Sequence, residues 1–370
     1  MIFIAPMERA SHILRSYRVP DIGSTFHDRE KELQKLLELE NFKIYTILGP
    51  LGCGKTKFIE ATAFYLKKTR GEIILTYIGY LRRGYNLYTR VFSTNKSIVK
   101  DFIKLHKKYH RLVSRSHEPV EGAELLGFVS PSSILKVVTK SRLFFKSRLK
   151  KRHLVVVDAI DEVLEERDLK AQIDRFQKSF REKYLSKVRR HGGSLKVVVI
   201  TSRKVVPATE TLLFWNLNKK DYFSLLEEIK CPLALEDAWK LCGGNTGLTL
   251  ELVSSDWILE KIFEKYLKKL KSIIIDEALS IRKPVNNIIE ELCKASNIDE
   301  LKLTSMWKRY EKEYVIIDLK NTKKMSEISY EKWIGRELAW QKPVFMYCHE
   351  AILLKGLEAK TRDVIKLFNR

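Results

Sequence analysis

The sequence predicts an α/β protein built on a buried parallel sheet, with helical segments after it. Three short apolar runs support this prediction. The run at 42–48 precedes a glycine-rich loop at 49–56, and a stretch with helical spacing of apolar residues follows at 55–68. Two more runs, at 154–157 and 197–200, end in polar residues. Such runs, alternating with loops and helices, are typical of buried parallel strands, whose carboxyl ends meet at one edge of a sheet.

Length and composition indicate two or three domains, because 370 residues exceed what one hydrophobic core usually holds. There is no apolar run of about 18 residues, the length that spans a bilayer, and no secretory leader pattern at the start. Five cysteines are scattered without a C-x-x-C pair, which is typical of a reducing compartment. We therefore expect a cytoplasmic protein without membrane contact.

The chain is strongly basic, with 69 Lys and Arg against 46 Asp and Glu, a formal net charge of +23. Such an excess attracts polyanions and makes nucleic acid a candidate partner. Alternatively, the excess of basic residues reflects a charged surface of the kind found in thermophilic proteins.

The segment GPLGCGKT fits the pattern G-x-x-x-x-G-K-[ST] of a phosphate-binding loop. Its glycines let successive N–H groups point at phosphate oxygens, and the positive end of the next helix faces the same site. Lys55 is expected to reach the β- and γ-phosphates, and the Thr56 hydroxyl to bind Mg²⁺. The predicted nucleotide-binding residues of the loop are Gly49, Pro50, Leu51, Gly52, Cys53, Gly54, Lys55 and Thr56.

A carboxylate for the metal is predicted in the segment HLVVVDAIDEVLE. Asp158 ends a buried strand there, beside the expected loop, and is the candidate second ligand of Mg²⁺. Ala159 stands where many such ATPases have a glutamate that orients the attacking water. Asp161 and Glu162 follow closely, and either can approach the γ-phosphate or serve as a first-turn acid of a helix. The missing adjacent glutamate predicts slow hydrolysis.

The strand predicted at 195–201 ends in Thr201, Ser202 and Arg203. Ligands bind at the carboxyl edge of open α/β sheets, so a hydroxyl and a guanidinium there can sense a γ-phosphate. Arg203 is therefore a candidate catalytic residue, with a surface ion pair as the alternative role.

The loop, DAIDE and TSR, in this order, resemble the STAND division of AAA+-related P-loop ATPases, in particular the archaeal ATPase family. Two further segments are similar to that family. The leading segment (residues 24–39) contains F-x-x-R-E-x-E-L, and LCGGNTGLTLEL at 241–252 resembles the glycine-containing lid motif, with Thr246 in place of the usual proline. The resemblance implies that Phe26 and Arg29 lie over the adenine and that Thr246 contacts the nucleotide.

The resemblance also implies a five-stranded parallel sheet of order 5-1-4-3-2. Its strands are expected near 43–48, 72–79, 153–158, 195–201 and 211–215. The implied domains are an α/β ATPase core at 1–215, a helical lid at 216–282 and a winged-helix-like domain at 283–370. The long interval before Asp158 predicts a basic helical insertion at about 81–150, with the clusters Arg82–Arg83, Lys107–Lys108 and 146–153.

The leading functional hypothesis is a slow, Mg²⁺-dependent ATPase that acts as a regulatory switch, with ATP and ADP as its ligands. A winged helix can bind double-stranded DNA or serve for protein contact or self-association. If it binds DNA, the expected phosphate contacts are Lys302, Lys308, Arg309 and Lys312. The alternatives are a replication-initiator-like DNA-remodelling ATPase and a non-hydrolysing module with structural ADP.

Overall fold

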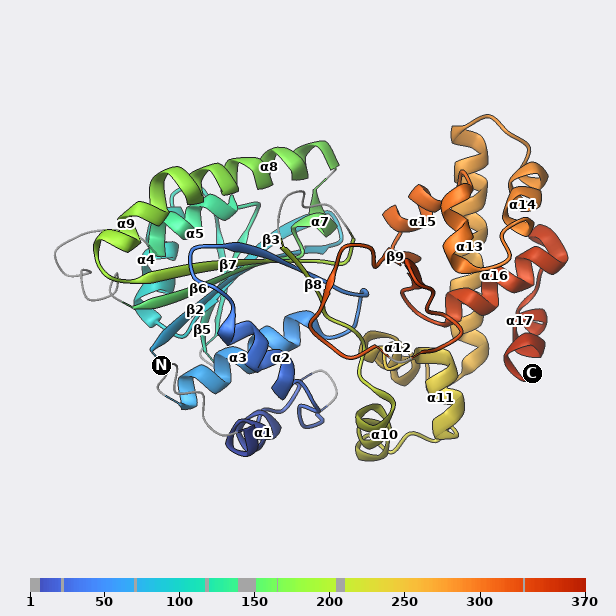
Figure 1. Ribbon diagram of the computed structural model, residues 1–370, viewed down its shortest axis with the longest axis horizontal. Coiled ribbons are helices and arrows are strands. Elements are labelled where there is room, and N and C mark those ends of the chain that lie inside the picture. Colours follow the sequence, from blue (N-terminus) through green and yellow to red (C-terminus); the bar gives the residue numbers. More distant parts are fainter. Residues whose placement is uncertain are drawn as a thin grey trace.

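The computed structural model describes residues 7–20, 23–69, 72–116, 120–138, 151–164, 166–203, 210–328 and 330–370. Figure 1 shows a large sheet with helices above and below it, and a mostly helical part beside it that contains the C-terminus. In the described part of the chain, no helix has both the length and the apolar character required to cross a membrane.

The sheet has nine strands in the order β10-β8-β1-β7-β6-β2-β3-β5-β4. Pairing is parallel from β10 to β2 and antiparallel from β2 to β4. The parallel strands from the α/β core are β1 (Ile44–Leu48), β2 (Ile73–Arg83), β6 (Arg152–Asp158), β7 (Ser194–Thr201) and β8 (Glu210–Leu213). β-branched and leucine residues buried on both faces explain why these apolar runs form the centre of the sheet.

The insertion was expected to be helical, but its described residues form strands that extend the sheet as well as two helices, so the purely helical expectation is wrong. β2 continues past the core and turns into β3, and two more antiparallel strands follow. The insertion contains β3 (Asn86–Ser93), α4 (Lys96–His106), β4 (Leu112–Ser116), β5 (Glu121–Leu126) and α5 (Pro131–Val138). The segment NLYTRVFS is rich in β-branched and aromatic residues, which fit a pleated surface better than a helix. Residues 146–150 of the third basic cluster lie outside the described part.

Helices cover both faces of the sheet, and each layer has its own hydrophobic cluster. One layer consists of α1 (Met7–Arg15), α2 (Glu30–Glu38) and α3 (Lys55–Lys68). The other contains α4, α5, α7 (Ile160–Val163), α8 (Glu166–Ser179) and α9 (Leu185–Arg190), with a π-helical turn at Phe180–Tyr184 between α8 and α9. Figure 1 shows these layers below and above the sheet.

The remainder of the chain is mostly helical and shares one hydrophobic cluster that runs from Leu217 to Phe368. Its helices are α10 (Lys219–Glu228), α11 (Leu235–Cys242), α12 (Thr246–Ser254), α13 (Leu259–Ser280), α14 (Val285–Cys293), α15 (Trp307–Lys312), α16 (Val344–Lys355) and α17 (Thr361–Phe368), with 3-10 turns at Ile298–Leu303 and Gly356–Glu358. The cluster contains residues from both sides of the expected 282/283 boundary.

A segment near the C-terminus returns to the α/β core. β9 (Ile316–Asp318) and β11 (Leu338–Trp340) form an antiparallel pair, while β10 (Lys323–Lys324) adds a parallel strand to β8. The carbonyl oxygen of Leu213 accepts hydrogen bonds from the amides of Met325 and Ser326. The core sheet and the C-terminal part are therefore joined by backbone pairing, close to the carboxyl edge where ligands bind.

Candidate nucleotide-binding site

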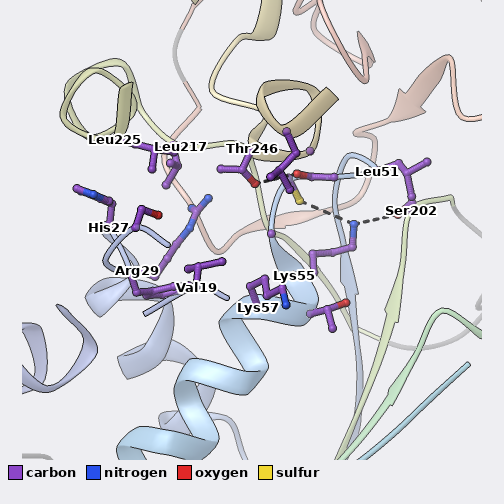
Figure 2. Close-up of a pocket in the computed structure, with 18 of the residues that line it drawn as sticks. Val19, His27, Arg29, Leu51, Lys55, Lys57, Ser202, Leu217, Leu225 and Thr246 are labelled. Atoms are coloured by element: carbon purple, nitrogen blue, oxygen red, sulfur yellow. Dashed lines mark hydrogen bonds between the residues drawn. The ribbon is translucent and has the colours of Figure 1, made fainter. Parts of the chain in front are cut away.

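A pocket of about 250 Å³ opens at the carboxyl edge of the sheet, between the glycine-rich loop, the leading segment and the start of α12. Figure 2 shows its two ends. Lys55 and Ser202 lie at the polar end, whereas Val19, Leu217 and Leu225 lie at the apolar end. A pocket with one polar and one apolar end suits a ligand with the same division.

The loop makes a tight turn that requires glycine. The backbone angle φ is 86° at Gly52 and 93° at Gly54, a region that other residues rarely adopt. Lys55 Nζ donates to the carbonyl oxygens of Gly49 and Pro50, at 2.8 Å each, and to Ser202 Oγ at 2.9 Å. Because α3 begins at Lys55, its first amides and the lysine charge are at the polar end of the pocket.

The predicted loop residues divide into two groups. Gly49 and Pro50 hold Lys55 through their carbonyl oxygens. The pocket wall contains Leu51, Gly52, Cys53, Gly54, Lys55 and Thr56. The buried Cys53 Sγ lies 3.8 Å from Lys55 Nζ, as expected for a small residue that fills the loop.

Thr56 and Asp158, the predicted metal ligands, are in contact. Thr56 Oγ donates to Asp158 Oδ2 at 2.6 Å, and the Tyr77 hydroxyl donates to the same oxygen at 3.0 Å. Burial raises the pKa of Asp158, and the hydrogen bond from Thr56, the charge of Lys55 and the hydrogen bond from Tyr77 oppose this shift. A hydroxyl beside a carboxylate is a hard-oxygen donor set of the kind that Mg²⁺ prefers, so the residues fit the predicted metal.

Asp161 and Glu162, which the sequence left as equal candidates, have different surroundings. Asp161 Oδ2 accepts a hydrogen bond from the Ser202 amide and lies 2.7 Å from Thr201 Oγ, so the side chain is buried against β7. Glu162 lines the pocket. The pocket walls desolvate its carboxyl group and raise its pKa to about 7, with smaller contributions from the Asp161 and Asp158 charges. The Glu162 side chain also has solvent-exposed surface.

Arg203 points away from the pocket wall and toward α7. Its Nη2 donates to the carbonyl oxygen of Asp161 at 2.8 Å, and its guanidinium lies 5.7 Å from the centre of the Tyr314 ring. Arg203 is not among the described residues that line the pocket, whereas its neighbour Ser202 is. Ser202, rather than Arg203, is therefore the residue of this segment that lines the pocket and contacts Lys55.

The apolar end includes Phe26 and Arg29, the two residues predicted over the base. The Arg29 guanidinium is already engaged: it pairs with Glu32 at 2.9 Å, donates to the Trp215 carbonyl oxygen at 2.8 Å and lies over the Phe214 ring. Through these contacts, Arg29 stabilises this wall of the pocket. Ser24 also lines it, with a buried hydroxyl for which the described residues provide no hydrogen-bond partner.

The start of α12 sits directly on the glycine-rich loop. Thr246 Oγ donates to the carbonyl oxygen of Gly52 at 3.0 Å, and the Gly247 amide donates to the same oxygen at 2.8 Å. The Asn245 side chain donates to the Leu51 carbonyl oxygen at 3.0 Å. Thr246 therefore lines the pocket, and its neighbours Asn245 and Gly247 join the start of α12 to the loop.

Gln341 is a contact that the sequence analysis missed. Its Oε1 accepts from the Leu51 amide at 2.7 Å, and its Nε2 donates to the carbonyl oxygens of Ser202 at 2.9 Å and Ile316 at 3.2 Å. The side chain is fully buried. It links the loop, the end of β7 and β9. Val19, His27, Leu217 and Leu225 also line the pocket without having been predicted.

A glycine-rich loop at the amino end of α3, with a threonine beside an aspartate at the end of a parallel strand, defines a P-loop nucleotide-binding protein. Residues 26–252 match the family described as an ATPase domain predominantly from Archaea. The match covers more than half of the chain, which therefore belongs to this family. Comparison with curated proteins finds no match to the chain.

Proposed function

We propose that this ATPase is a slow, Mg²⁺-dependent molecular switch, in which the nucleotide controls the docking of a C-terminal module (residues 283–370). The observation that carries the proposal is Gln341, because one buried side chain joins the phosphate-binding loop to that module. A winged-helix-like character of the module is supported by the order of α14 and α15 before the β9–β11 pair.

The polar end of the pocket supports binding of a triphosphate with its metal. When bound, Mg²⁺ neutralises phosphate charge and helps to orient the phosphates. Thr56 and Asp158 would hold it, since their oxygens lie side by side. Lys55 would exchange its contacts with loop carbonyl oxygens for phosphate oxygens, and the loop amides would surround the phosphates. The apolar end, with Val19 and Leu225, would cover the base.

Slow turnover follows from the placement of the acids. Ala159 leaves no carboxylate directly after Asp158, and Asp161 is held by the end of β7. Glu162 is the remaining acid of this segment that lines the pocket, so it would orient water and accept its proton. A single acid at the pocket edge supports modest catalysis.

Three contacts support coupling between the nucleotide and the C-terminal module. Gln341 bonds the loop amide at Leu51, the Tyr314 hydroxyl donates to the Asp161 carbonyl oxygen at 3.2 Å, and the Ser326 hydroxyl accepts from the Trp215 amide at 3.1 Å. All three join the module to segments that would flank the phosphates or the base of a bound nucleotide. A ligand that shifts the loop or α7 would change these contacts and alter the affinity of the module for the core.

The direct test combines calorimetry with hydrogen exchange on the full chain. We expect binding of ATP with Mg²⁺, loss of that binding in Lys55→Ala, and turnover that falls in Asp158→Asn. Amide exchange at 323–326 should differ between the ATP-bound and ADP-bound protein if the module responds to the nucleotide. Equal exchange in both states would contradict the switch. ADP retained through purification without turnover would instead identify a structural nucleotide.

A further inference from the structure

The excess positive charge of the chain lies almost entirely in the α/β core. Residues 1–210 contain 42 Lys and Arg against 22 Asp and Glu, whereas residues 211–370 contain 27 against 24. The core thus carries +20 of the net +23, and the C-terminal 160 residues carry +3. The chain after residue 210 is therefore close to neutral overall, which gives little support to the DNA contact considered for its C-terminal end.

Three of the four cations predicted to contact DNA in the C-terminal part have acidic partners, whereas Lys312 is exposed and has no ion pair among the described residues. Lys302 lies 2.7 Å from Glu337, Lys308 3.2 Å from Glu311, and Arg309 3.6 Å from Asp276. Lys302 is only about one-fifth exposed. Phosphate contacts from these three cations would have to replace the ion pairs that they already form.

One helical layer of the core is strongly basic. From Lys96 to Lys108, along α4 and just after it, there are five lysines and one aspartate; from Asp168 to Arg190, along α8 and α9, there are eight basic and three acidic residues. Both stretches pack on the same face of the sheet through a shared hydrophobic cluster, with α5 between them. Figure 1 shows these helices together on one side of the sheet. We call this layer of α4, α5, α8 and α9 the basic face.

The cations of the basic face are exposed and available. Lys96, Lys100, Lys104, Arg175, Lys178 and Lys183 all have exposed side chains. Within the part of the chain that the structure describes, none of these six has a carboxylate within 4.0 Å. Arg175, Lys178 and Lys183 line a groove of about 380 Å³ with the hydroxyls of Ser130 and Ser132, and Glu182 is its one described acid.

We propose that the basic face binds the phosphate backbone of double-stranded DNA. Its longest helical run, Glu166–Arg190, extends roughly 37 Å at 1.5 Å per residue, close to the ~34 Å of one turn of B-DNA. Cations along it can therefore follow successive phosphates of the duplex. Serine hydroxyls in the groove are common phosphate donors. A membrane surface is a poorer fit, because no large hydrophobic side chain is exposed on the described parts of α4, α5, α8 or α9.

The test measures binding of the full chain to a labelled duplex of about 20 base pairs, two helical turns, between about 50 and 200 mM salt. The variant combines Arg175→Gln, Lys178→Gln and Lys183→Gln. The matched control combines Lys268→Gln, Lys355→Gln and Lys366→Gln, three exposed lysines of the C-terminal part. Both remove three charges, so a difference between them reports position rather than net charge.

We expect the basic-face variant to lose about tenfold or more in affinity and its salt slope to fall by roughly two to three, the share of three phosphate contacts. The control should stay within about twofold of the wild type. Equal losses in both variants, absence of wild-type binding, or preference for anionic vesicles over the duplex would each overturn the proposal. Lys55→Ala should keep its duplex affinity without nucleotide, so failure of this proposal is distinct from failure of the ATP site.

Discussion

The amide of Gly247, at the start of α12, donates a hydrogen bond of 2.8 Å to the carbonyl oxygen of Gly52 in the phosphate-binding loop. The two residues also touch through their backbones. A Cβ added to Gly247 would come within 2.7 Å of the Gly52 Cα atom. The lid segment thus rests directly on the loop backbone, at a distance that only glycine permits.

Gly247→Ala should therefore weaken nucleotide binding by lifting α12 from the loop. We expect about a tenfold loss of affinity for ATP with Mg²⁺, measured by calorimetry. Unchanged affinity would show that the lid contact is not needed for the ligand.

Gln341→Leu should loosen the C-terminal segment. The substitution leaves the Leu51 amide and the Ser202 carbonyl oxygen buried without this partner, a cost of about 1–3 kcal/mol for each buried group. Amide exchange at 323–326 and in β9 should become faster in the nucleotide-free protein, and its difference between nucleotide states should shrink. Lys332→Gln, on an exposed side chain nearby in sequence, is the control and should leave both unchanged. A Gln341→Leu protein with wild-type exchange would show that the side chain does not hold the segment.

The sequence predicted those parts of the site whose residues lie close together along the chain in a recognisable pattern. Lys55 and Thr56 follow from one continuous motif, and Asp158 follows from a buried run that ends in an acid. Such patterns reflect backbone geometry within a few residues, so one sequence is enough to recognise them. Their positions at the pocket and the Thr56–Asp158 contact agree with that spacing.

Long-range contacts account for what the sequence did not indicate. Gln341 is 290 residues from Leu51 along the chain, and no spacing pattern connects the two. The strands β3 and β5 were missed for a related reason, because their strand character depends on pairing with β2 and with each other. The basic clusters of this segment favoured solvent-exposed helices and gave no sign of that pairing.

Glu162→Gln should separate binding from turnover. The amide keeps the shape of the side chain but cannot accept a proton, so we expect turnover to fall by roughly 10²-fold, with ATP affinity close to that of the wild type. In the wild type, kcat/KM should rise with pH toward a plateau above about 7, because the carboxyl group must lose its proton and its pKa is about 7.

The pH profile of kcat/KM is more informative than that of kcat, because it reports the pKa values of the free enzyme rather than those of the enzyme–substrate complex. The same rise in the Glu162→Gln protein would assign the titration to another group. Full activity of that protein would show that Glu162 does not take part in the reaction.

His349 should make the stability of the C-terminal part depend on pH. The side chain is 5% exposed, packs against the Trp340 ring and lies 3.3 Å from the Tyr310 hydroxyl. Burial lowers its pKa from 6.5 to about 4, so the folded protein keeps the ring neutral where the unfolded chain would protonate it. Its stabilising contribution is therefore complete above about pH 6.5 and is lost as the pH falls toward 4, by on the order of 3 kcal/mol in total.

His349→Gln removes this titration and retains a polar partner for Tyr310. We expect the free energy of unfolding of the wild type, measured with urea, to fall more steeply between pH 7.5 and pH 5 than that of the variant, by roughly 2 kcal/mol. Other titrating groups cancel in this difference because both proteins contain them. His12→Gln, on the exposed side of α1, is the matched control and should follow the wild type. Parallel pH curves for the wild type and His349→Gln would mean that the ring takes up a proton in the folded protein, against the effect expected from its burial.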